Sequence, residues 1–150
     1  MQKITTYLTF NDQAEEAMKF YTSIFKNSSI VNTMRIGDNV LSGTFQIDGQ
    51  EFVVLNGGPH FTFAEGMSLF VSCEDQEEID ELYEKLSAGG EKQPCGWLKD
   101  KFGVSWQIVP PVLGELLSDP DPVKSQRVMD AMLKMYKIDI QALKQAYEQS

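Results

Sequence analysis

Apolar and polar residues alternate along this chain with two different periods, which predict helices in some segments and strands in others. Two segments carry the spacing i, i+3, i+4, i+7 that lays apolar side chains on one face of a helix. These apolar stripes are Ala17, Phe20, Tyr21 and Ile24 in the first segment, and Ile79, Leu82, Tyr83 and Leu86 in the second. We therefore expect two helices that each bury one side.

The two helical segments are copies of one repeated unit. The stretch 12–21 is echoed by 75–83, and a strand-like run precedes each copy, at 7–10 and 70–73. Each copy thus starts with a strand that is followed by a helix, and the repeat predicts two related modules. Paired modules can enclose a cleft, and clefts are where small molecules bind.

The first module is predicted to have the order strand, helix, strand, strand, strand. Asp12 with Glu15 has the spacing of a capping box, which predicts the start of a helix that ends near Lys26-Asn27. The pair Asp48-Gly49 favours a tight hairpin between two of the strands. The expected strands are 3–10, 29–36, 39–48 and 50–56.

The second module repeats this order. Asp75 with Glu78 forms a second capping-box pattern, and Gly89-Gly90 is typical of the end of a helix. Pro110-Pro111 should end the last strand, because proline cannot donate a hydrogen bond to a sheet. The expected strands are 67–73, 91–97, a weak candidate at 98–101, and 104–109.

The tail lies outside the repeat and is predicted to be helical at 113–117, 123–136 and 139–148. Its apolar faces need a partner, which we expect to be the sheet or a second subunit. A Met-rich binding groove is the functional alternative, although methionine stripes are usually core. We predict a single domain, 1–150, made of module one at 1–58, module two at 66–111 and a helical extension at 112–150.

Composition narrows the possible functions. The chain has 150 residues, of which 42% are hydrophobic, and a formal net charge of -9, which disfavours nucleic acid and anionic membranes as partners. No apolar run is long enough to cross a bilayer, and the first residues do not have the pattern of a secretory leader, so we expect a cytoplasmic protein. Cys73 and Cys95 are expected to be free thiols in a reducing compartment, with a single bridge between them as the alternative.

Short motifs, taken in their order along the chain, resemble a known superfamily. The runs Tyr7-Leu8-Thr9-Phe10, 16–21 and 101–107, together with the paired modules, are similar to the vicinal oxygen chelate superfamily of glyoxalases, bleomycin-resistance proteins and extradiol dioxygenases. The resemblance implies an α+β fold of two tandem β-α-β-β-β modules. These would form a curved, incompletely closed mixed sheet with outer helices and a site in its concave face.

A narrower resemblance concerns one branch of that superfamily. The segments 95–100, 119–121 and 127–134 are similar to the PhnB-like branch, whose sequences often carry the label 3-demethylubiquinone-9 3-methyltransferase. We also expect a homodimer, in which the tail or a sheet edge contributes to the interface.

Catalytic members of the superfamily hold a divalent metal with His and Glu side chains from the first and last strands of each module. Matching the strands places Thr6, Val54, Ser68 and Gln107 at these positions, within one residue of register. None of the four is ionisable, so affinity for a divalent metal should be severely weakened. The one histidine, His60, falls in a loop. We therefore predict no metal and no other cofactor.

The methyltransferase label implies a site for a nucleotide-like methyl donor. Such donors are commonly held by a glycine-rich turn between a strand and a helix of a doubly wound sheet. Gly57-Gly58 leads instead into Pro59 and a Phe-rich loop, and Gly89-Gly90 closes a helix. Both pairs are ordinary backbone uses of glycine, and the residues give the label no support.

What remains is a cavity lined by polar and aromatic side chains, whose hydroxyl and amide groups suit a neutral or anionic small molecule. Strand alternation places Ser42, Thr44 and Gln46 on one face, and Ser105 with Gln107 on another. The alternatives are that these groups form the solvated side of a sheet and that the aromatic residues belong to the core. The ligand-binding candidates are Ser42, Thr44, Gln46, Asn56, His60, Phe61, Ser68, Phe70, Cys95, Trp97, Asp100, Ser105 and Gln107.

Cys95 is a candidate nucleophile or redox sensor, because Lys92, Lys99 and Lys101 lie near it in the sequence and positive charge makes a thiolate more available. A nucleophilic cysteine needs a base, which in this chain would have to be His60. The alternative is an inert thiol at the rim of the sheet. Asp100 could act as a general base or could simply be a solvated loop carboxylate.

Three functions follow from these observations. The first is a small-molecule binder that works without the usual metal and is related to bleomycin-resistance proteins. The second is an atypical enzyme of the superfamily, a lyase, a dioxygenase or the methyltransferase of the label, that uses Gln107, Asp100 or Cys95. The third is a purely structural or protein-interaction role, which would be favoured if the chain's own side chains fill the concave face.

Overall fold

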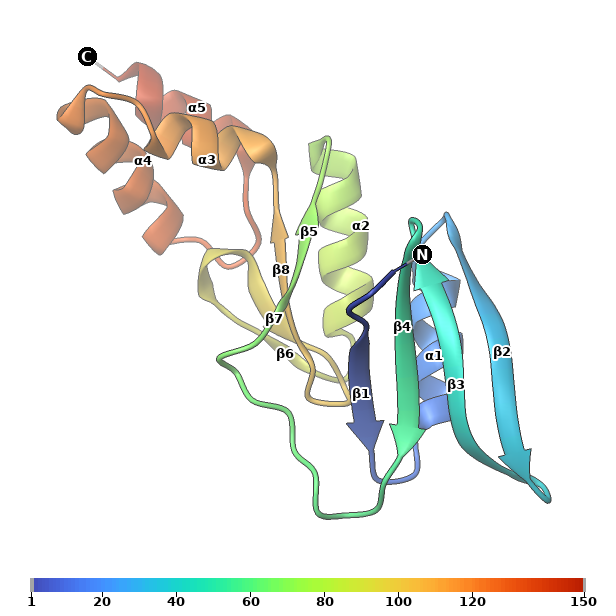
Figure 1. The fold of residues 1–150 in the computed structure, drawn as a ribbon. Coiled ribbons are helices and arrows are strands. Elements are labelled where there is room, and N and C mark those ends of the chain that lie inside the picture. The colour runs from blue at the N-terminus through green and yellow to red at the C-terminus, as the bar shows by residue number, and fades with distance from the viewer. Residues whose placement is uncertain (1, 150) are drawn as a thin grey trace. The chain divides into compact units, whose positions relative to one another are not determined.

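The computed structural model describes residues 2–149, so the first and last residues of the predicted domain ranges lie outside it. The chain divides into two compact units, one that ends at Phe63 and one that begins at Ala64. Each unit contains the predicted order of strand, helix and further strands, and the α+β fold expected from the sequence is confirmed (Figure 1). No helix within residues 2–149 has the length and apolar character needed to span a membrane.

The first unit is a four-stranded mixed sheet with one helix on it. In the strand order β1-β4-β3-β2, β1 is parallel to β4 and the other pairs are antiparallel. Asp48 and Gly49 have φ values of 51° and 84°, as a tight hairpin between β3 and β4 requires. The elements are β1 Thr6–Phe10, α1 Ala14–Ile24, β2 Ser28–Ile36, β3 Asn39–Ile47 and β4 Gln50–Asn56.

Helix α1 buries its apolar stripe on one face of this sheet. Met18 and Tyr21 are fully buried, and the ring of Tyr21 stacks on that of Phe45 with a centroid distance of 5.7 Å. Phe45 in turn stacks on Phe52 at 5.2 Å. A Cβ atom at Gly43 would lie 2.5 Å from Cε of Met18, so a side chain at this strand position would displace the end of the Met18 side chain. The predicted apolar stripe therefore forms the core of the first unit.

The predicted capping box at the start of α1 is wrong. The helix begins after Gln13, whose side chain makes no capping hydrogen bond, and the N–H of Ala14 donates instead to Oδ1 of Asn56 at 2.9 Å. Glu15 pairs with Arg35 on β2 rather than turning back to the helix end. A residue from β4, distant in the sequence, has replaced the local cap.

The second unit is a smaller sheet with a longer helix. In the strand order β5-β8-β7-β6, β5 is parallel to β8. The capping residue of its helix is Asp75, as predicted: the N–H of Glu78 donates to Asp75 Oδ1 at 2.9 Å. The elements up to β8 are β5 Leu69–Ser72, α2 Gln76–Ser87, β6 Glu91–Lys92, the 3-10 helix η1 Pro94–Gly96, β7 Trp97–Lys99 and β8 Ser105–Val109.

The continuous strand predicted over 91–97 is wrong, because η1 interrupts it. The N–H groups of Cys95 and Gly96 donate to the carbonyl oxygens of Met135 and Tyr136, at 2.8 and 2.7 Å. The tail thus takes the hydrogen bonds that a neighbouring strand would otherwise accept. Cys95 has a φ of 64°, a conformation that residues other than glycine rarely adopt.

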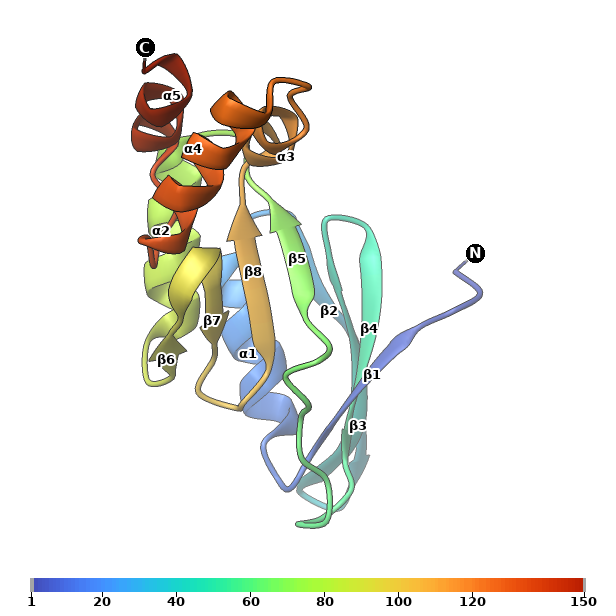
Figure 2. The same cartoon turned by 90° about the vertical axis from the view of Figure 1, so that its left-hand side faces the viewer.

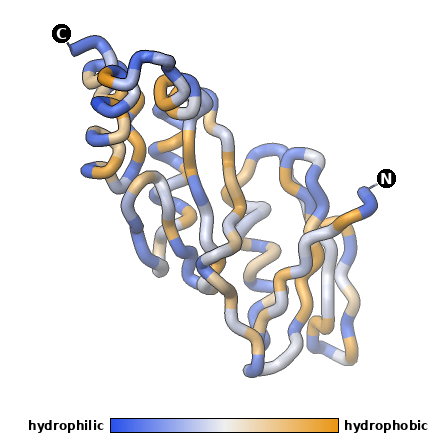
Figure 3. Tube along the Cα trace, turned by 60° about the vertical axis from the view of Figure 1, so that its left-hand side comes forward, coloured by the Kyte–Doolittle hydropathy of each residue, from blue (hydrophilic) through white to orange (hydrophobic). Residues whose placement is uncertain are grey.

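The tail helices pack on one another and on the end of β8. They are α3 Pro111–Leu117, α4 Pro122–Leu133 and α5 Ile140–Glu148, and Figure 2 shows them gathered beyond the carboxyl ends of β5 and β8. Apolar stretches recur along them, near the C-terminus in Figure 3. Their core consists of Val109, Leu113, Val128, Ile138 and Leu143, all buried. The apolar faces of the tail therefore find their partner within the second unit.

The side chain of Gln76 anchors the tail to α2, beside the ion pair between Lys137 of the tail and Asp80 of α2. Nε2 of Gln76 donates to the carbonyl oxygen of Ile138 at 2.9 Å, and the N–H of Ile140 donates to Oε1 of the same amide at 2.8 Å. Gln76 thereby provides hydrogen-bond partners for the backbone groups on both sides of Asp139, the residue that precedes α5. The position of the tail on the second unit is fixed by polar as well as apolar contacts.

Candidate functional site

Three side chains form a row across the second sheet, on the face away from α2. Phe70 on β5 and Trp97 on β7 are both register partners of Gln107 on β8. Successive strand residues point to opposite faces, and the neighbours of Gln107, which are Trp106 and Ile108, are buried. Gln107 is partly exposed between two aromatic side chains.

The amide of Gln107 is held in one orientation. Its Nε2 donates to Oγ of Ser68 at 2.9 Å, so two of the predicted binding residues are brought together. No residue among 2–149 donates to Oε1 of Gln107. That oxygen can accept a hydrogen bond from a bound molecule.

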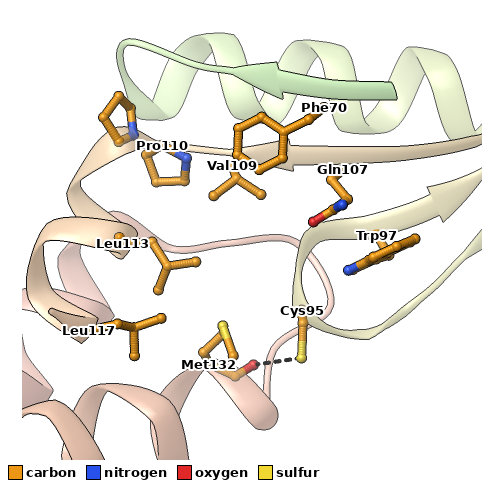
Figure 4. A pocket seen from close by; sticks show the side chains of 11 residues that line it. Phe70, Cys95, Trp97, Gln107, Val109, Pro110, Leu113, Leu117 and Met132 are labelled. Atoms are coloured by element: carbon orange, nitrogen blue, oxygen red, sulfur yellow. Dashed lines mark hydrogen bonds between the residues drawn. The ribbon is translucent and has the colours of Figure 1, made fainter. Parts of the chain in front are cut away.

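The row lies in a cavity of about 460 Å³ (Figure 4). Phe70, Trp97 and Gln107 belong to the sheet side, and Leu113, Leu117 and Met132 of the tail lie across from them. Of the predicted binding residues, the structure places four in this lining: Phe70, Cys95, Trp97 and Gln107. The remaining lining residues are Val109, Pro110, Pro111, Leu113, Gly114, Leu117 and Met132.

The tail residues of this wall were not predicted as site residues. The sequence contained one indication, the apolar face on which Met132 lies, but nothing local showed that this face would stand opposite the sheet. None of the described lining residues carries a charge. Because burial of an unpaired charge is costly, the cavity is suited to an uncharged group.

The backbone beneath Trp97 is held from the helix side of the sheet. The hydroxyl of Tyr83 donates to the carbonyl oxygens of Gln93 and Trp97, at 2.9 and 3.0 Å. Burial raises the pKa of Tyr83 to about 12, so this donor keeps its proton at neutral pH. These bonds fix both ends of the segment that contains η1, and with it the position of Trp97.

Cys95 lies at the cavity, but the structure does not supply the activation that the sequence suggested. Its Sγ donates to the carbonyl oxygen of Met132 at 3.7 Å. The neighbouring lysines are engaged elsewhere: Lys92 pairs with Glu84, Lys99 pairs with Glu65, and Lys101 lies over the ring of Phe102. His60 belongs to the first unit and Cys95 to the second, so their pairing remains a prediction.

The expectation that Asp100 is a solvated loop carboxylate is wrong, and its role as a general base remains a prediction. The side chain is only 2% exposed. Its Oδ1 accepts hydrogen bonds from the N–H groups of Phe102 and Val104, at 2.9 and 3.0 Å, and its Oδ2 accepts one from Nε1 of Trp106 at 2.9 Å. Asp100 closes the turn between β7 and β8 and does not line the cavity.

The predicted polar face of β3 exists in the first unit. Ser42, Thr44 and Gln46 alternate with the buried Gly43 and Phe45, and so share the face away from α1. Gln46 is committed to local structure, because it donates to Oγ of Ser29 and accepts from the N–H of Gly49. A binding role for this face remains a prediction.

The other candidates have separate environments. Asn56 serves α1, as described above, and its Nδ2 donates to the carbonyl oxygen of Val40 at 3.0 Å. His60 and Phe61 are exposed in the loop after β4. Ser105 is 2% exposed, its hydroxyl has no hydrogen-bond partner within the described part of the chain, and it does not border the cavity.

The strand positions matched to metal ligands need a correction in the first unit. Val54 is fully buried, and Thr6 is the register partner of the buried Phe52, so both lie on the face that α1 covers. The face away from α1 carries Tyr7, Thr9, Val53 and Leu55 instead. Hydroxyl and apolar groups there, with the amide of Gln107 in the second unit, do not fit a divalent metal. Within residues 2–149, no three His, Cys, Asp or Glu side chains gather as metal ligands.

The fold also does not fit a nucleotide-like methyl donor. Both described sheets are four-stranded and mixed, whereas such a donor is commonly held by a doubly wound sheet. The turns from β1 to α1 and from β5 to α2 are Asn11-Asp12-Gln13 and Cys73-Glu74-Asp75. Both lack glycine and carry acidic residues, so they do not form a phosphate-type cradle.

The geometry can be compared with known proteins. The sequence model described as 3-demethylubiquinone-9 3-methyltransferase matches residues 2–109. A PhnB protein from Bacillus cereus, to which the same description has been attached, is 43% identical; the match covers 73% of this chain and 99% of that one, with a TM-score of 0.66. The comparison with curated proteins found none that matches.

More distant solved structures share the fold. Protein PA1353 from Pseudomonas aeruginosa is 19% identical, with 73% of this chain and 98% of that chain covered and a TM-score of 0.64. The fosfomycin resistance protein FosX from Listeria monocytogenes, solved with Mn(II) and sulfate, is 20% identical, with 79% and 100% covered and a TM-score of 0.58. These likenesses concern the arrangement of strands and helices alone.

Proposed function

The chain belongs to the family described as 3-demethylubiquinone-9 3-methyltransferase, a PhnB-like branch of the vicinal oxygen chelate superfamily, and we propose that it binds a small organic molecule without a divalent metal. The observation that supports this most directly is the cavity of about 460 Å³ in the second unit. Small-molecule sites are typically concave, mostly apolar, of this size, and equipped with a few placed polar groups.

Gln107 is the group that would orient the molecule. One amide hydrogen is used by Ser68, and this bond fixes the carbonyl oxygen Oε1 as an acceptor in the cavity. A ligand hydroxyl or N–H that donates to it would satisfy a partly buried polar group in apolar surroundings, where a hydrogen bond counts for more than in water. Binding would therefore depend on one polar contact and on apolar packing around it.

The test is a screen of small aromatic and aliphatic compounds against the full chain by ligand-detected NMR, followed by calorimetry of the hits. Gln107→Leu should weaken the hits about tenfold, because loss of one hydrogen bond in such a site costs roughly 1.4 kcal/mol. Gln126→Leu is the matched control, since Gln126 is exposed on α4 and does not border the cavity.

Thermal unfolding of both variants checks that each one folds. The proposal fails if the screen yields no binder, or if every hit binds Gln107→Leu as tightly as it binds the unaltered protein. Equal weakening by Gln126→Leu would also count against it, because the effect would then not belong to the cavity.

We further propose that the protein forms a homodimer. Tyr7 and Met34 are 62% and 58% exposed, and the register of β1 and β2 places both on the face of the first sheet away from α1. They lie on the two edge strands of this sheet, and large apolar side chains exposed on one sheet face favour an interaction surface. Sedimentation velocity should show a dimer that Tyr7→Lys weakens; a monomer at high micromolar concentration would contradict the proposal.

A cytoplasmic location is also proposed. Cys73 and Cys95 are both free thiols, which suits a reducing compartment. Recovery of the protein from an oxidising compartment after cell fractionation would contradict it.

A further inference from the structure

We infer that the helical tail makes the cavity of the second unit selective for neutral, flat aromatic molecules. This inference rests on the proposed function and names the class of ligand and the element that selects it. The sequence match to the family ends at Val109, whereas α3 and α4 supply Leu113, Leu117 and Met132 to the cavity lining. The wall that closes the sheet face thus comes from outside the matched region.

The sheet side has a geometry suited to a ring. Phe70 and Trp97 lie on the strands that flank Gln107, and two strand spacings amount to roughly 10 Å. Contacting carbon atoms are about 3.5–4.0 Å apart, so the space above the amide accommodates one ring with an aromatic side chain on each side of it. Phe70 is 60% exposed, which leaves its apolar surface available to such a ring.

The tail side selects for charge. Leu113, Leu117 and Met132 present only apolar groups, and the described lining residues include no cation or carboxylate. An ionic group on the ligand would lose its hydration without gaining a counter-ion, which is unfavourable. A neutral ring with one donor directed at Oε1 of Gln107 meets the requirements of both walls.

The tail side of the cavity is fixed to the sheet, so that it can discriminate between ligands. The N–H groups of Cys95 and Gly96, on the sheet side, donate to the carbonyl oxygens of Met135 and Tyr136, on the tail side. Val128 of α4 and Leu143 of α5 are buried in the core of the tail. A cavity wall can distinguish between ligands only if it keeps its position, and these contacts join the tail to the sheet.

Gly114 offers a way to fill the cavity without disturbing the fold. It borders the cavity on α3, and a Cβ atom added there would meet no described atom within 4 Å, its chain neighbours and the backbone of its own helix aside. Leucine is also a better helix former than glycine. Gly114→Leu should therefore occupy part of the cavity and leave the thermal unfolding temperature unchanged or higher. Glu115→Leu, at the exposed neighbouring position, is the control for an added leucine.

Two dyes of the same ring system provide the probes. N-phenylnaphthylamine is neutral, and anilinonaphthalene sulfonate carries a negative charge on a similar frame. We expect saturable binding of the neutral dye to the full chain, read by its fluorescence and by energy transfer from tryptophan, and at least tenfold weaker binding of the sulfonate. Gly114→Leu and Phe70→Ala should each weaken the neutral dye at least tenfold.

Phe61→Ala is the control for Phe70→Ala, because Phe61 is similarly exposed, at 56%, and does not line the cavity. Equal affinity for both dyes, lost for both in Gly114→Leu, would overturn the ligand class but leave the proposed function standing. Dye binding unchanged in Gly114→Leu would overturn the role of the tail. The proposed function itself fails separately, when neither the dyes nor any screened compound responds to Gln107→Leu.

Discussion

Trp106 donates its indole N–H to the carboxylate of Asp100 at 2.9 Å, and both side chains are only 2% exposed. Two backbone N–H groups, of Phe102 and Val104, donate to the other carboxylate oxygen. This buried acceptor therefore satisfies three donors in the turn that leads into β8, the strand that carries Gln107.

We expect Asp100→Asn to destabilise the second unit by about 2–4 kcal/mol. The amide keeps one acceptor oxygen, but its NH₂ group would face a donor, and a buried hydrogen bond to a charged group is worth roughly 1.5–3 kcal/mol. Both tryptophans lie in the second unit, so urea unfolding followed by tryptophan fluorescence measures the effect. Asp130→Asn is the control, because Asp130 is exposed and, among residues 2–149, accepts a hydrogen bond only from the side chain of Gln126. An unfolding midpoint equal to that of the control would show that Asp100 is not structural.

The two capping-box patterns should respond differently to alanine. Asp75→Ala should cost about 1 kcal/mol, the usual effect of removing a helix cap, because Asp75 accepts from the N–H of Glu78. Asp12→Ala should have little effect, because α1 begins without a side-chain cap at Gln13 and uses Asn56 instead. Urea unfolding followed by circular dichroism compares the two variants. Equal losses would mean that Asp12 does cap α1.

Gly90→Ala should destabilise the second unit by more than about 2 kcal/mol, at the upper end of overpacking effects. A Cβ atom at Gly90 would lie 2.1 Å from the carbonyl oxygen of Lys99, and backbone cannot move aside as a flexible side chain can. Gly66→Ala is the control, since a Cβ there meets nothing within 4 Å. The measurement is thermal unfolding of both variants, and similar unfolding temperatures would contradict the prediction.

The stability of the second unit should fall as the pH rises from about 9 towards 12. Burial raises the pKa of the Cys73 thiol from 9.0 to about 12, helped by Glu78 and Asp75. A folded-state pKa above the unfolded value means that this contribution is complete below pH 9 and is lost as the pH approaches 12, by at most about 1.4 kcal/mol per pH unit.

In the Cys73→Ala variant, the unfolding free energy should fall less steeply over the same pH range. Part of the fall should remain, because burial also raises the pKa of Tyr83 to about 12. The comparison concerns the slope of the unfolding free energy against pH, because alanine also changes packing. Identical slopes would show that Cys73 does not titrate differently in the folded and unfolded states.

The sequence alone was sufficient to predict features that depend on residues close together along the chain. The helical stripe that includes Ile79 and Leu82, the cap at Asp75 and the Asp48-Gly49 hairpin were all predicted, because each follows from local spacing. Strand alternation likewise placed Gln107 and Ser105 on one face. The same local reasoning failed at Asp12, where a residue of β4 competes with the local cap.

Only the tertiary structure decided how distant segments meet. Phe70 and Met132 line one cavity, although α2, β6, η1, β7, β8 and α3 separate them in the sequence. Asp100 is a buried acceptor because Trp106 folds back over its turn, and η1 forms because the tail supplies carbonyl oxygens to Cys95 and Gly96. The spacing of apolar residues predicts which side of a helix or strand is buried. The element that covers this side depends on the packing of the whole unit. For that reason the sequence predicted a sheet face with Gln107, and the structure was needed to show the wall that stands opposite it.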